Sequence, residues 1–279
     1  CMSTITNIAA NEANYDVLFK SGAIFHALMS SAHFSDDILM ELSALTISNL
    51  TCSSNNLRLI AERGGIAPLI RVIRSQNSSS HTICAAIGAI KRLATNGVNR
   101  DSLVKKGILV ILIEASRLKE IDAQREIASC LFQLSSSSYI RHRIVEVCGG
   151  VLFTHAESCD GEIAKQSAAS FANLAEEAEL HHVLKDLGIA ESLRNLFEHK
   201  DITVTREASR CISNLFSSLE LHFEISPYIL YPMMEAVSTQ DEQILYHVAL
   251  ALRKLSSNSL AQEALVPHMT LWIPNKWNG

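Results

Sequence analysis

The stretch AASFANL at residues 168–174 decides the fold, because versions of it recur along the whole chain. ALTISNL, SRCISNL and ALALRKL are close copies, and IGAIKRL and ASCLFQL are looser ones. The other copies end at Ile8, Leu50, Leu93, Leu134, Leu215 and Leu255. These ends recur with a nearly constant period of about 41 residues, which indicates stacked structural repeats.

Each repeat contains three helical segments, and the second full repeat has the most regular pattern. A short helix is predicted over residues 55–63, and Gly64-Gly65 can supply the positive φ that ends it. Pro68 falls in the first turn of the next helix, where its missing N–H costs nothing. A polar linker then leads to a long third helix at residues 83–95.

These patterns predict one array over residues 1–258. We predict a partial repeat at 1–10 and full repeats at 11–52, 53–95, 96–136, 137–176, 177–217 and 218–257. Residues 259–279 begin a further short helix and then form an irregular tail that does not match the repeat. The chain starts at Cys1 inside a helical pattern, so we expect either a fragment or a gene model that misses upstream repeats.

Two repeats depart from the pattern. In the fourth, the stretch from Gly150 to Leu174 is shorter than the equivalent stretch from Gly188 to Leu215. Its second helix also turns polar near His155, so we expect it to pack poorly. In the sixth repeat, Ser226-Pro227 replaces the glycine joint.

A short helix, a glycine joint, a middle helix with proline in its first turn and a long third helix ending in Asn-Leu together resemble the armadillo repeat. The resemblance implies an all-α, right-handed superhelical solenoid with three helices per repeat of about 41 residues. The HEAT repeat is the nearest alternative, but it lacks the short helix and the glycine joint.

Two positions in each third helix predict close helix packing. Three residues before the terminal Leu or Ile stands a large apolar residue, and four before it stands a small one, as in the pairs Ile47 and Thr46 or Phe171 and Ser170. Large and small residues at fixed places let helices of successive repeats nest about 8–10 Å apart. Such repeats bury their apolar faces only against neighbours, so the ends of an array need caps.

The residue just before the terminal Leu or Ile is always polar. The series is Asn7, Asn49, Arg92, Gln133, Asn173, Asn214 and Lys254, and its members from Asn49 onward are called the ladder below. Resemblance to armadillo proteins implies that these side chains line a concave groove, where a carboxamide can pair with the backbone of an extended peptide. We therefore predict a peptide-binding groove. Its predicted residues are Asn49, Arg92, Gln133, Asn173, Arg210, Asn214 and Lys254. The alternative is that an Asn here is simply a favourable residue near a helix end.

The predicted groove departs from that of nuclear-import armadillo adaptors, which carry Trp four residues before the ladder Asn. The equivalent positions here are Ser3, Leu45, Gly88, Ser129, Ala169, Arg210 and Leu250. The cations Arg92, Arg210 and Lys254 would also repel a basic peptide, which favours acidic or phosphorylated segments. Asp122, Glu126, Glu162 and Glu207 are predicted on the same face, so the field is mixed.

Composition narrows the choice of partners. Net charge is −5 with no run of Lys or Arg, so no footprint for nucleic acid or anionic lipid is present. The longest apolar run, residues 108–113, is too short to cross a bilayer. Seven Cys without a Cys-x-x-Cys pair indicate reduced thiols in the cytoplasm, with the nucleus as a further location. We expect a monomer.

Chemistry-bearing residues give no catalytic constellation. His155, Glu157 and Cys159 form at most part of a metal site, because structural zinc needs four ligands. His181-His182 has the pattern of a solvated surface pair, and the Ser runs at 78–80 and 135–138 fit linkers. Gly64-Gly65 and Gly149-Gly150 lack the Lys of a phosphate loop. We predict no metal, no cofactor and no enzyme activity.

The leading interpretation is an adaptor that binds an extended or helical segment of a partner protein. Two alternatives stay open: an armadillo scaffold at a membrane or cytoskeleton, and a targeting module of a larger protein of the ubiquitin-ligase type. The membrane form would need an N-terminal acylation sequence upstream of Cys1.

Overall fold

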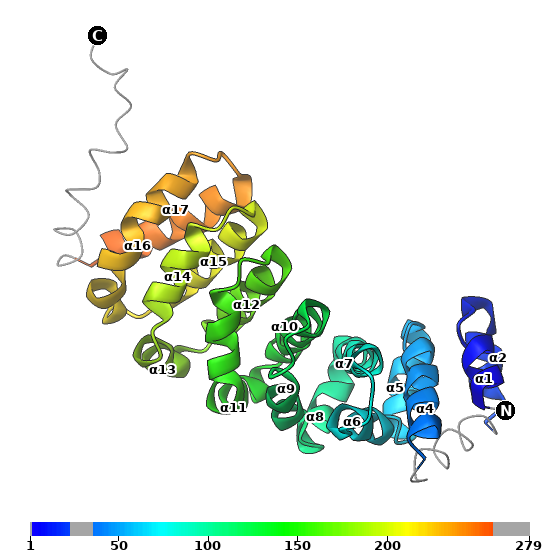
Figure 1. Ribbon diagram of the computed structural model, residues 1–279. Helices are drawn as coiled ribbons and strands as arrows, with labels where there is room; N and C mark the ends of the chain where they lie inside the picture. Colours follow the sequence, from blue (N-terminus) through cyan, green and yellow to red (C-terminus); the bar gives the residue numbers. More distant parts are fainter. Residues whose placement is uncertain (1, 23–35, 259–279) are drawn as a thin grey trace. The chain divides into compact units, whose positions relative to one another are not determined.

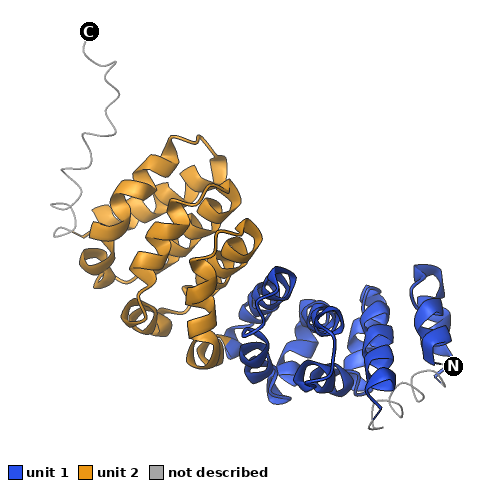
Figure 2. Ribbon diagram, in the orientation of Figure 1, with its two compact units in different colours: residues 1–140 blue, residues 141–279 orange. Residues whose placement is uncertain are grey.

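A computed structural model of the chain describes residues 2–22 and 36–258. Within these ranges all regular structure is helical and no β-strand occurs. The chain divides into two compact units, Cys1–Ile140 and Arg141–Gly279 (Figure 2). Each unit is a row of helices in which the third helices of successive repeats lie side by side (Figure 1).

The first unit is built from the helices of the early repeats. It begins with α1 (Met2–Ile8), α2 (Tyr15–Lys20) and α4 (Asp37–Leu50). The second helix of the first full repeat, predicted at residues 23–31, lies outside the described residues. The next two repeats follow in order as α5 (Leu57–Glu62), α6 (Ile66–Arg74), α7 (Ser80–Thr95), α8 (Gly97–Lys105), α9 (Ile108–Ala115) and α10 (Ile121–Ser135).

The boundary between the units falls in the first turn of α11 (Ser138–Ala156). The second unit continues with α12 (Gly161–Leu174), α13 (His181–Asp186), α14 (Ile189–Phe197), α15 (Ile202–Leu215), α16 (Leu221–Val237) and α17 (Glu242–Ser256). Within it α12 packs against α15, and α15 against α17. The predicted bounds of the individual repeats stay a prediction.

Most of the third helices begin at a side chain that accepts hydrogen bonds from the first backbone N–H groups. These N-cap residues are Asp36, Ser79, Asp160, Asp201 and Asp241. An Asp or Ser oxygen satisfies donors that have no partner inside the helix. The start of each of these helices is thus fixed by one residue that recurs with the repeat.

Glycine at positive φ follows the first helix of four repeats, including Gly22 (φ 60°) after α2. Gly64, Gly107 and Gly188 have φ values of 90°, 81° and 93°, which residues with a Cβ rarely adopt. Each lies between the short helix and the middle helix. The glycine joint predicted from the sequence is therefore present in these repeats.

The expected break between first and second helices is wrong in the fourth and sixth repeats. There α11 runs continuously through Gly149 and Gly150, and α16 runs through Pro227 and Pro232. No residue at either joint has a positive φ, in contrast to Gly64, Gly107 and Gly188. The expected poor packing of the fourth repeat stays a prediction, because Leu152, His155 and Ala156 are buried whereas Thr154 and Glu157 are exposed.

The core follows the large-and-small pattern. The large residues Ile47, Ile90, Leu131, Phe171 and Ile212 are all 0% exposed. The small residues Thr46, Ala89, Cys130, Ser170 and Cys211 are equally buried. The Phe171 ring also meets Phe153 of α11, with ring centroids 4.8 Å apart. Each third helix is therefore held by contacts that depend on residue size at two positions.

A polar side chain near the start of several repeats caps the end of the preceding third helix. It donates to, or pairs with, the carbonyl six residues earlier: Asn14 with Ile8, Asn99 with Leu93, His181 with Ala175 and His222 with Phe216, at 2.8–3.0 Å. Carbonyls at a helix end lack internal partners, so these contacts satisfy them. The prediction of a solvated His181-His182 pair is therefore wrong for His181, which is 1% exposed.

We expect Phe171→Ala to lower the free energy of unfolding by about 3–5 kcal/mol, because it opens a cavity between α11 and α12. Urea denaturation followed by circular dichroism measures this. The matched control is Tyr139→Ala, which removes a ring that is 92% exposed and should change stability by less than about 0.5 kcal/mol. Equal effects of the two changes would contradict the packing described above.

Candidate binding surface

The predicted ladder residues all lie in the last turns of third helices. Asn49, Arg92 and Gln133 belong to the first unit, and Asn173, Asn214 and Lys254 to the second. Asn173 is buried at 7% exposure, and the other five are half-buried. Arg210, one turn before Asn214, is also half-buried. Within each unit the ladder is thus a row of partly covered polar groups.

Arg92 is turned toward the preceding third helix. Its Nε donates to Thr51 Oγ1 at 2.9 Å, and its Nη2 donates to the oxygens of Ser48 at 2.9 and 3.2 Å. A Cβ at Gly88 would lie 3.3 Å from Glu126 Oε2, which is a tight contact, and 3.5 Å from Arg92 Nη1, which is an ordinary one. The guanidinium therefore joins α7 to α4.

Arg210 has the same role in the second unit. Its Nη1 donates to Asn173 Oδ1 at 3.0 Å, and its Nη2 donates to the Ala169 carbonyl at 3.1 Å. Its Nε donates to Glu207 at 2.9 Å, and Glu176 lies 3.6 Å away. Two carboxylates thus balance this cation. Because these carboxylates offset the charge of Arg210, this residue does not support the expected repulsion of basic segments.

The remaining ladder residues of this unit also reach back by one repeat. Asn214 Nδ2 donates to the Ala172 carbonyl at 3.0 Å, and Lys254 Nζ donates to the Ser213 carbonyl. Burial lowers the pKa of Lys254. These bonds to the preceding third helix were not predicted from the sequence. The regular repeat spacing was the available signal, because it places each polar side chain beside the end of the preceding third helix.

Three carboxamides among the predicted groove residues keep hydrogen-bonding atoms without a partner in the described part of the chain. The side chains of Asn49 and Gln133 make no hydrogen bond with another described residue, and Asn214 uses only its Nδ2. Each carboxamide offers a donor and an acceptor. Among the described residues, these polar atoms are therefore unpaired.

The acidic residues predicted on the same face are partly paired. Lys91 Nζ lies 2.7 Å from Glu126 Oε2, and Glu207 bonds Arg210. This Glu126 oxygen is buried and accepts no conventional hydrogen bond, but an ammonium at 2.7 Å is an ion-pair contact that satisfies it. Glu162 instead bonds Gln166 within its own helix. The surface charge is mixed, as the sequence predicts.

The other polar clusters do not form a catalytic or metal site in the described residues. His155 is 4% exposed in the core, whereas Cys159 is exposed. No group of three His, Cys, Asp or Glu within residues 2–22 and 36–258 is placed to hold a metal ion. Burial raises the pKa of the Cys148 and Cys211 thiols to about 12, so both stay protonated at neutral pH.

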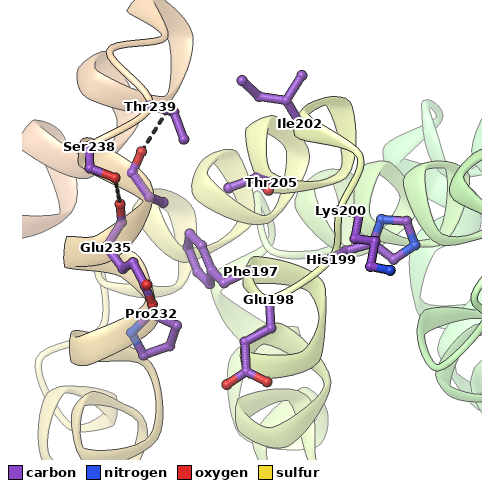
Figure 3. A pocket seen from close by; sticks show the side chains of 11 residues that line it. Phe197, Glu198, His199, Lys200, Ile202, Thr205, Pro232, Glu235, Ser238 and Thr239 are labelled. Carbon is purple, nitrogen blue, oxygen red and sulfur yellow. Dashed lines mark hydrogen bonds between the residues drawn. The ribbon is translucent and has the colours of Figure 1, made fainter.

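A depression of about 470 Å³ lies on the second unit, between the ends of α14 and α16 (Figure 3). Phe197 and Pro232 supply apolar walls, and Glu198 and Lys200 stand at its rim. Its Ser238 and Thr239 hydroxyls donate to backbone carbonyls of α16 at 2.7 Å. The hydroxyl groups therefore serve to end the helix, and the depression shows no activated nucleophile.

No helix in the described ranges is both long and apolar enough to cross a membrane. The sequence matches no protein-family model, and it matches no curated protein.

Solved structures share the fold. An engineered protein superimposes with a TM-score of 0.82 over 92% of this chain, at 21% identity, and this chain spans 64% of that one. A designed armadillo repeat protein in complex with the peptide (KR)4 gives 0.74 over 82% of this chain and 98% of its own, at 18% identity. Computationally designed armadillo repeat proteins for modular peptide recognition give 0.70 over 76% and 91%, at 17% identity. The chain therefore has an armadillo-repeat-like solenoid fold.

We expect Arg210→Ala to lower the free energy of unfolding by about 1–3 kcal/mol, because the Ala169 carbonyl and Asn173 lose a charged donor. Urea denaturation measures the loss. The control is Arg194→Ala, whose guanidinium makes an exposed pair with Glu198 and should contribute less than about 1 kcal/mol. A loss no larger than that of the control would mean that Arg210 is dispensable for joining α15 to α12.

His155 should make stability depend on pH. Burial lowers its pKa to about 4, from an unfolded value of 6.5. The unfolded chain therefore takes up the proton first. The stabilisation is complete above pH 6.5 and is lost as pH falls toward 4, by up to about 3 kcal/mol. The stability difference between wild type and His155→Gln, measured by urea denaturation across this range, should shrink accordingly. A constant difference would rule out this linkage.

Proposed function

We propose that this protein is a non-enzymatic scaffold that binds an extended segment of a partner protein on the third-helix face of its repeats. The observation that carries the proposal is the row of polar residues at the ends of the third helices. Asn49, Gln133 and Asn214 in this row keep free hydrogen-bonding atoms among the described residues.

The spacing of the row fits an extended chain. Helices of successive repeats nest about 10 Å apart. An extended peptide rises about 3.3 Å per residue, so the row offers one side chain for roughly every third residue of the ligand. A carboxamide that donates and accepts at this spacing binds backbone groups whatever the ligand sequence.

The structural relatives support the same function by analogy of fold. One of them holds the peptide (KR)4, and another was designed for modular peptide recognition. In this chain Glu207 and Glu176 flank Arg210, so the surface charge selects neither a basic nor an acidic segment. Recognition in this proposal depends on backbone hydrogen bonds, with side-chain selectivity added by each repeat.

The proposal includes the setting of the protein. We place it in the cytoplasm, with access to the nucleus, as a monomer that acts without cofactor, metal or nucleic acid. The cysteines of the described ranges are present as thiols, which fits a reducing compartment.

The test uses peptides selected from a random-sequence phage library against the full chain, with affinities measured by titration calorimetry. Asn49→Ala/Gln133→Ala removes two carboxamides of the first unit. Each hydrogen bond contributes on the order of 1 kcal/mol net, so the double change should weaken a peptide bound there by about thirtyfold. Asn214→Ala should weaken a peptide bound to the second unit by about fivefold.

The matched control is Asn195→Ala, which removes an exposed carboxamide from the middle helix α14. It should leave affinity unchanged. Circular dichroism confirms that each variant keeps its helices. Selected peptides that bind all ladder variants as tightly as the control would place binding on another face and contradict the proposal.

A further inference from the structure

Helix α16 turns an aromatic and acidic face to solvent. Glu224, Tyr228, Tyr231 and Glu235 are four, three and four residues apart, so they form one stripe along the helix. Tyr228 is 54% exposed, Tyr231 is 58% exposed, and both glutamates are exposed as well. The buried faces of α16 pack on α13, α14 and α17 (Figure 1). The stripe is therefore the face of α16 that none of these helices covers.

The two tyrosines have no part in holding the fold together. Their hydroxyl groups make no hydrogen bond, and their rings meet no other ring, within the part of the chain that the structure describes. Phe223 is 44% exposed and lies four residues before Pro227, which is exposed too and lies four residues before Tyr231. Exposed apolar groups that adjoin one another in this way mark interaction sites more often than isolated ones do.

The preceding repeat does not have this surface. His181 of the fifth repeat and His222 of the sixth cap third helices in the same way, so the offset between these two residues relates the two repeats. At this offset the two tyrosines of the stripe stand where the fifth repeat has Leu187 and Ala190. The tyrosine rings are therefore a feature of the sixth repeat and not of the repeat pattern.

The stretch that contains α16 is free of Lys and Arg. None occurs between Arg210 and Arg253. The same stretch contains five acidic residues, which are Glu220, Glu224, Glu235, Asp241 and Glu242. Negative charge that is concentrated in this way attracts cationic partners and repels nucleic acid and anionic lipid.

A neighbouring cation neutralises only one end of the stripe. Lys185 Nζ of α13 lies 3.0 Å from Glu224 Oε2. The carboxylate of Glu235 makes no ion pair or hydrogen bond with a described residue, and it borders the depression of Figure 3. Lys200 stands on the opposite side of that depression, with Phe197 between the two side chains. A partner that brings a cation to Glu235 therefore completes an ion pair that the described residues leave open.

We propose that this face of α16 docks a segment of a partner protein that is rich in Lys or Arg. The face of a tyrosine ring attracts a cation that lies within about 6 Å of the ring centre. The Cα–Cβ bonds of a helix point toward its N-terminus, so Tyr228 leans toward Glu224, and Glu235 leans toward Tyr231. Each ring thus has a carboxylate beside it, and a cationic side chain laid between the two contacts both groups.

The two pairs of ring and carboxylate set the spacing of the cations. The pair of Glu224 with Tyr228 and the pair of Tyr231 with Glu235 are centred about two helical turns apart, which is about 10 Å. A chain in the polyproline II conformation presents every third side chain on the same side, at intervals of about 9 Å. We therefore expect an extended segment with a basic residue at least at every third position. This surface is separate from the third-helix face, so the proposal does not depend on the proposed function.

The test titrates the peptide (KR)4 into the full chain at low ionic strength by isothermal calorimetry. We expect binding that weakens as salt is added. Tyr228→Leu/Tyr231→Leu keeps apolar bulk at both positions but removes the ring faces, so it should weaken binding about tenfold. Tyr228→Phe/Tyr231→Phe keeps the ring faces and should bind the peptide as the wild type does.

The same assay tests the charge of the face. Glu235→Gln should weaken binding about threefold, because the open carboxylate is lost. The matched control is Asp101→Asn on α8, which removes an exposed carboxylate without a described partner from the other unit and should have no effect. Circular dichroism checks that every variant keeps its helices.

Four results would overturn the proposal. The first is the absence of (KR)4 binding, and the second is equal affinity of the Leu and Phe variants. The third is an equal effect of Glu235→Gln and Asp101→Asn, which would show unspecific attraction to an acidic protein. The fourth concerns Asn214→Ala, which should leave the affinity unchanged. If it weakens binding while the tyrosine variants do not, the peptide lies on the third-helix face, as in the proposed function.

Discussion

The structure depends on the contact between third helices of successive repeats. That contact requires a small residue beside a large one at fixed places, as with Ser170 and Phe171, which are both 0% exposed. Close approach of two helices gains many weak dispersion contacts, and each is lost if the gap widens. Since a repeat has no other partner for this face, its stability is shared with its neighbours.

Polar side chains add a second layer of contacts between repeats. Arg92, Arg210 and Asn214 donate across one period to oxygens on the preceding third helix, and His181 and Asn99 cap the ends of third helices from the following repeat. Carbonyls near a helix end have no partner within the helix. A side chain that reaches them fixes the register of two repeats, whereas apolar contacts alone tolerate sliding.

Much of the fold could be predicted from the sequence. Apolar spacing marks the third helices, and the positive φ at Gly64, Gly107 and Gly188 follows from glycine at a fixed joint. Nothing local showed that α11 and α16 would run through their joints, because Gly149 and Pro227 are both compatible with a break and with a continuing helix. The burial of His181 could not be predicted from the sequence for a related reason. Its partner carbonyl at Ala175 becomes close only once the chain has turned.

The position of the candidate surface could be predicted from the sequence, but the hydrogen bonding of its side chains could not. The polar series before each terminal Leu located the ladder, yet the sequence does not show which members are already bonded. A side chain committed to the preceding helix, such as Arg210, cannot leave for a ligand without opening the contact between α12 and α15. Asn49 and Gln133 carry no such commitment in the described part of the chain. The ladder therefore contains side chains that join neighbouring third helices, such as Arg92, Arg210 and Asn214, and side chains that make no such bond within the described residues, which are Asn49 and Gln133. In the ladder of the first unit, Arg92 is bonded to the preceding third helix and stands between Asn49 and Gln133 in the series. In the proposed function, a ligand backbone along this unit would therefore meet a carboxamide with unpaired atoms on each side of Arg92.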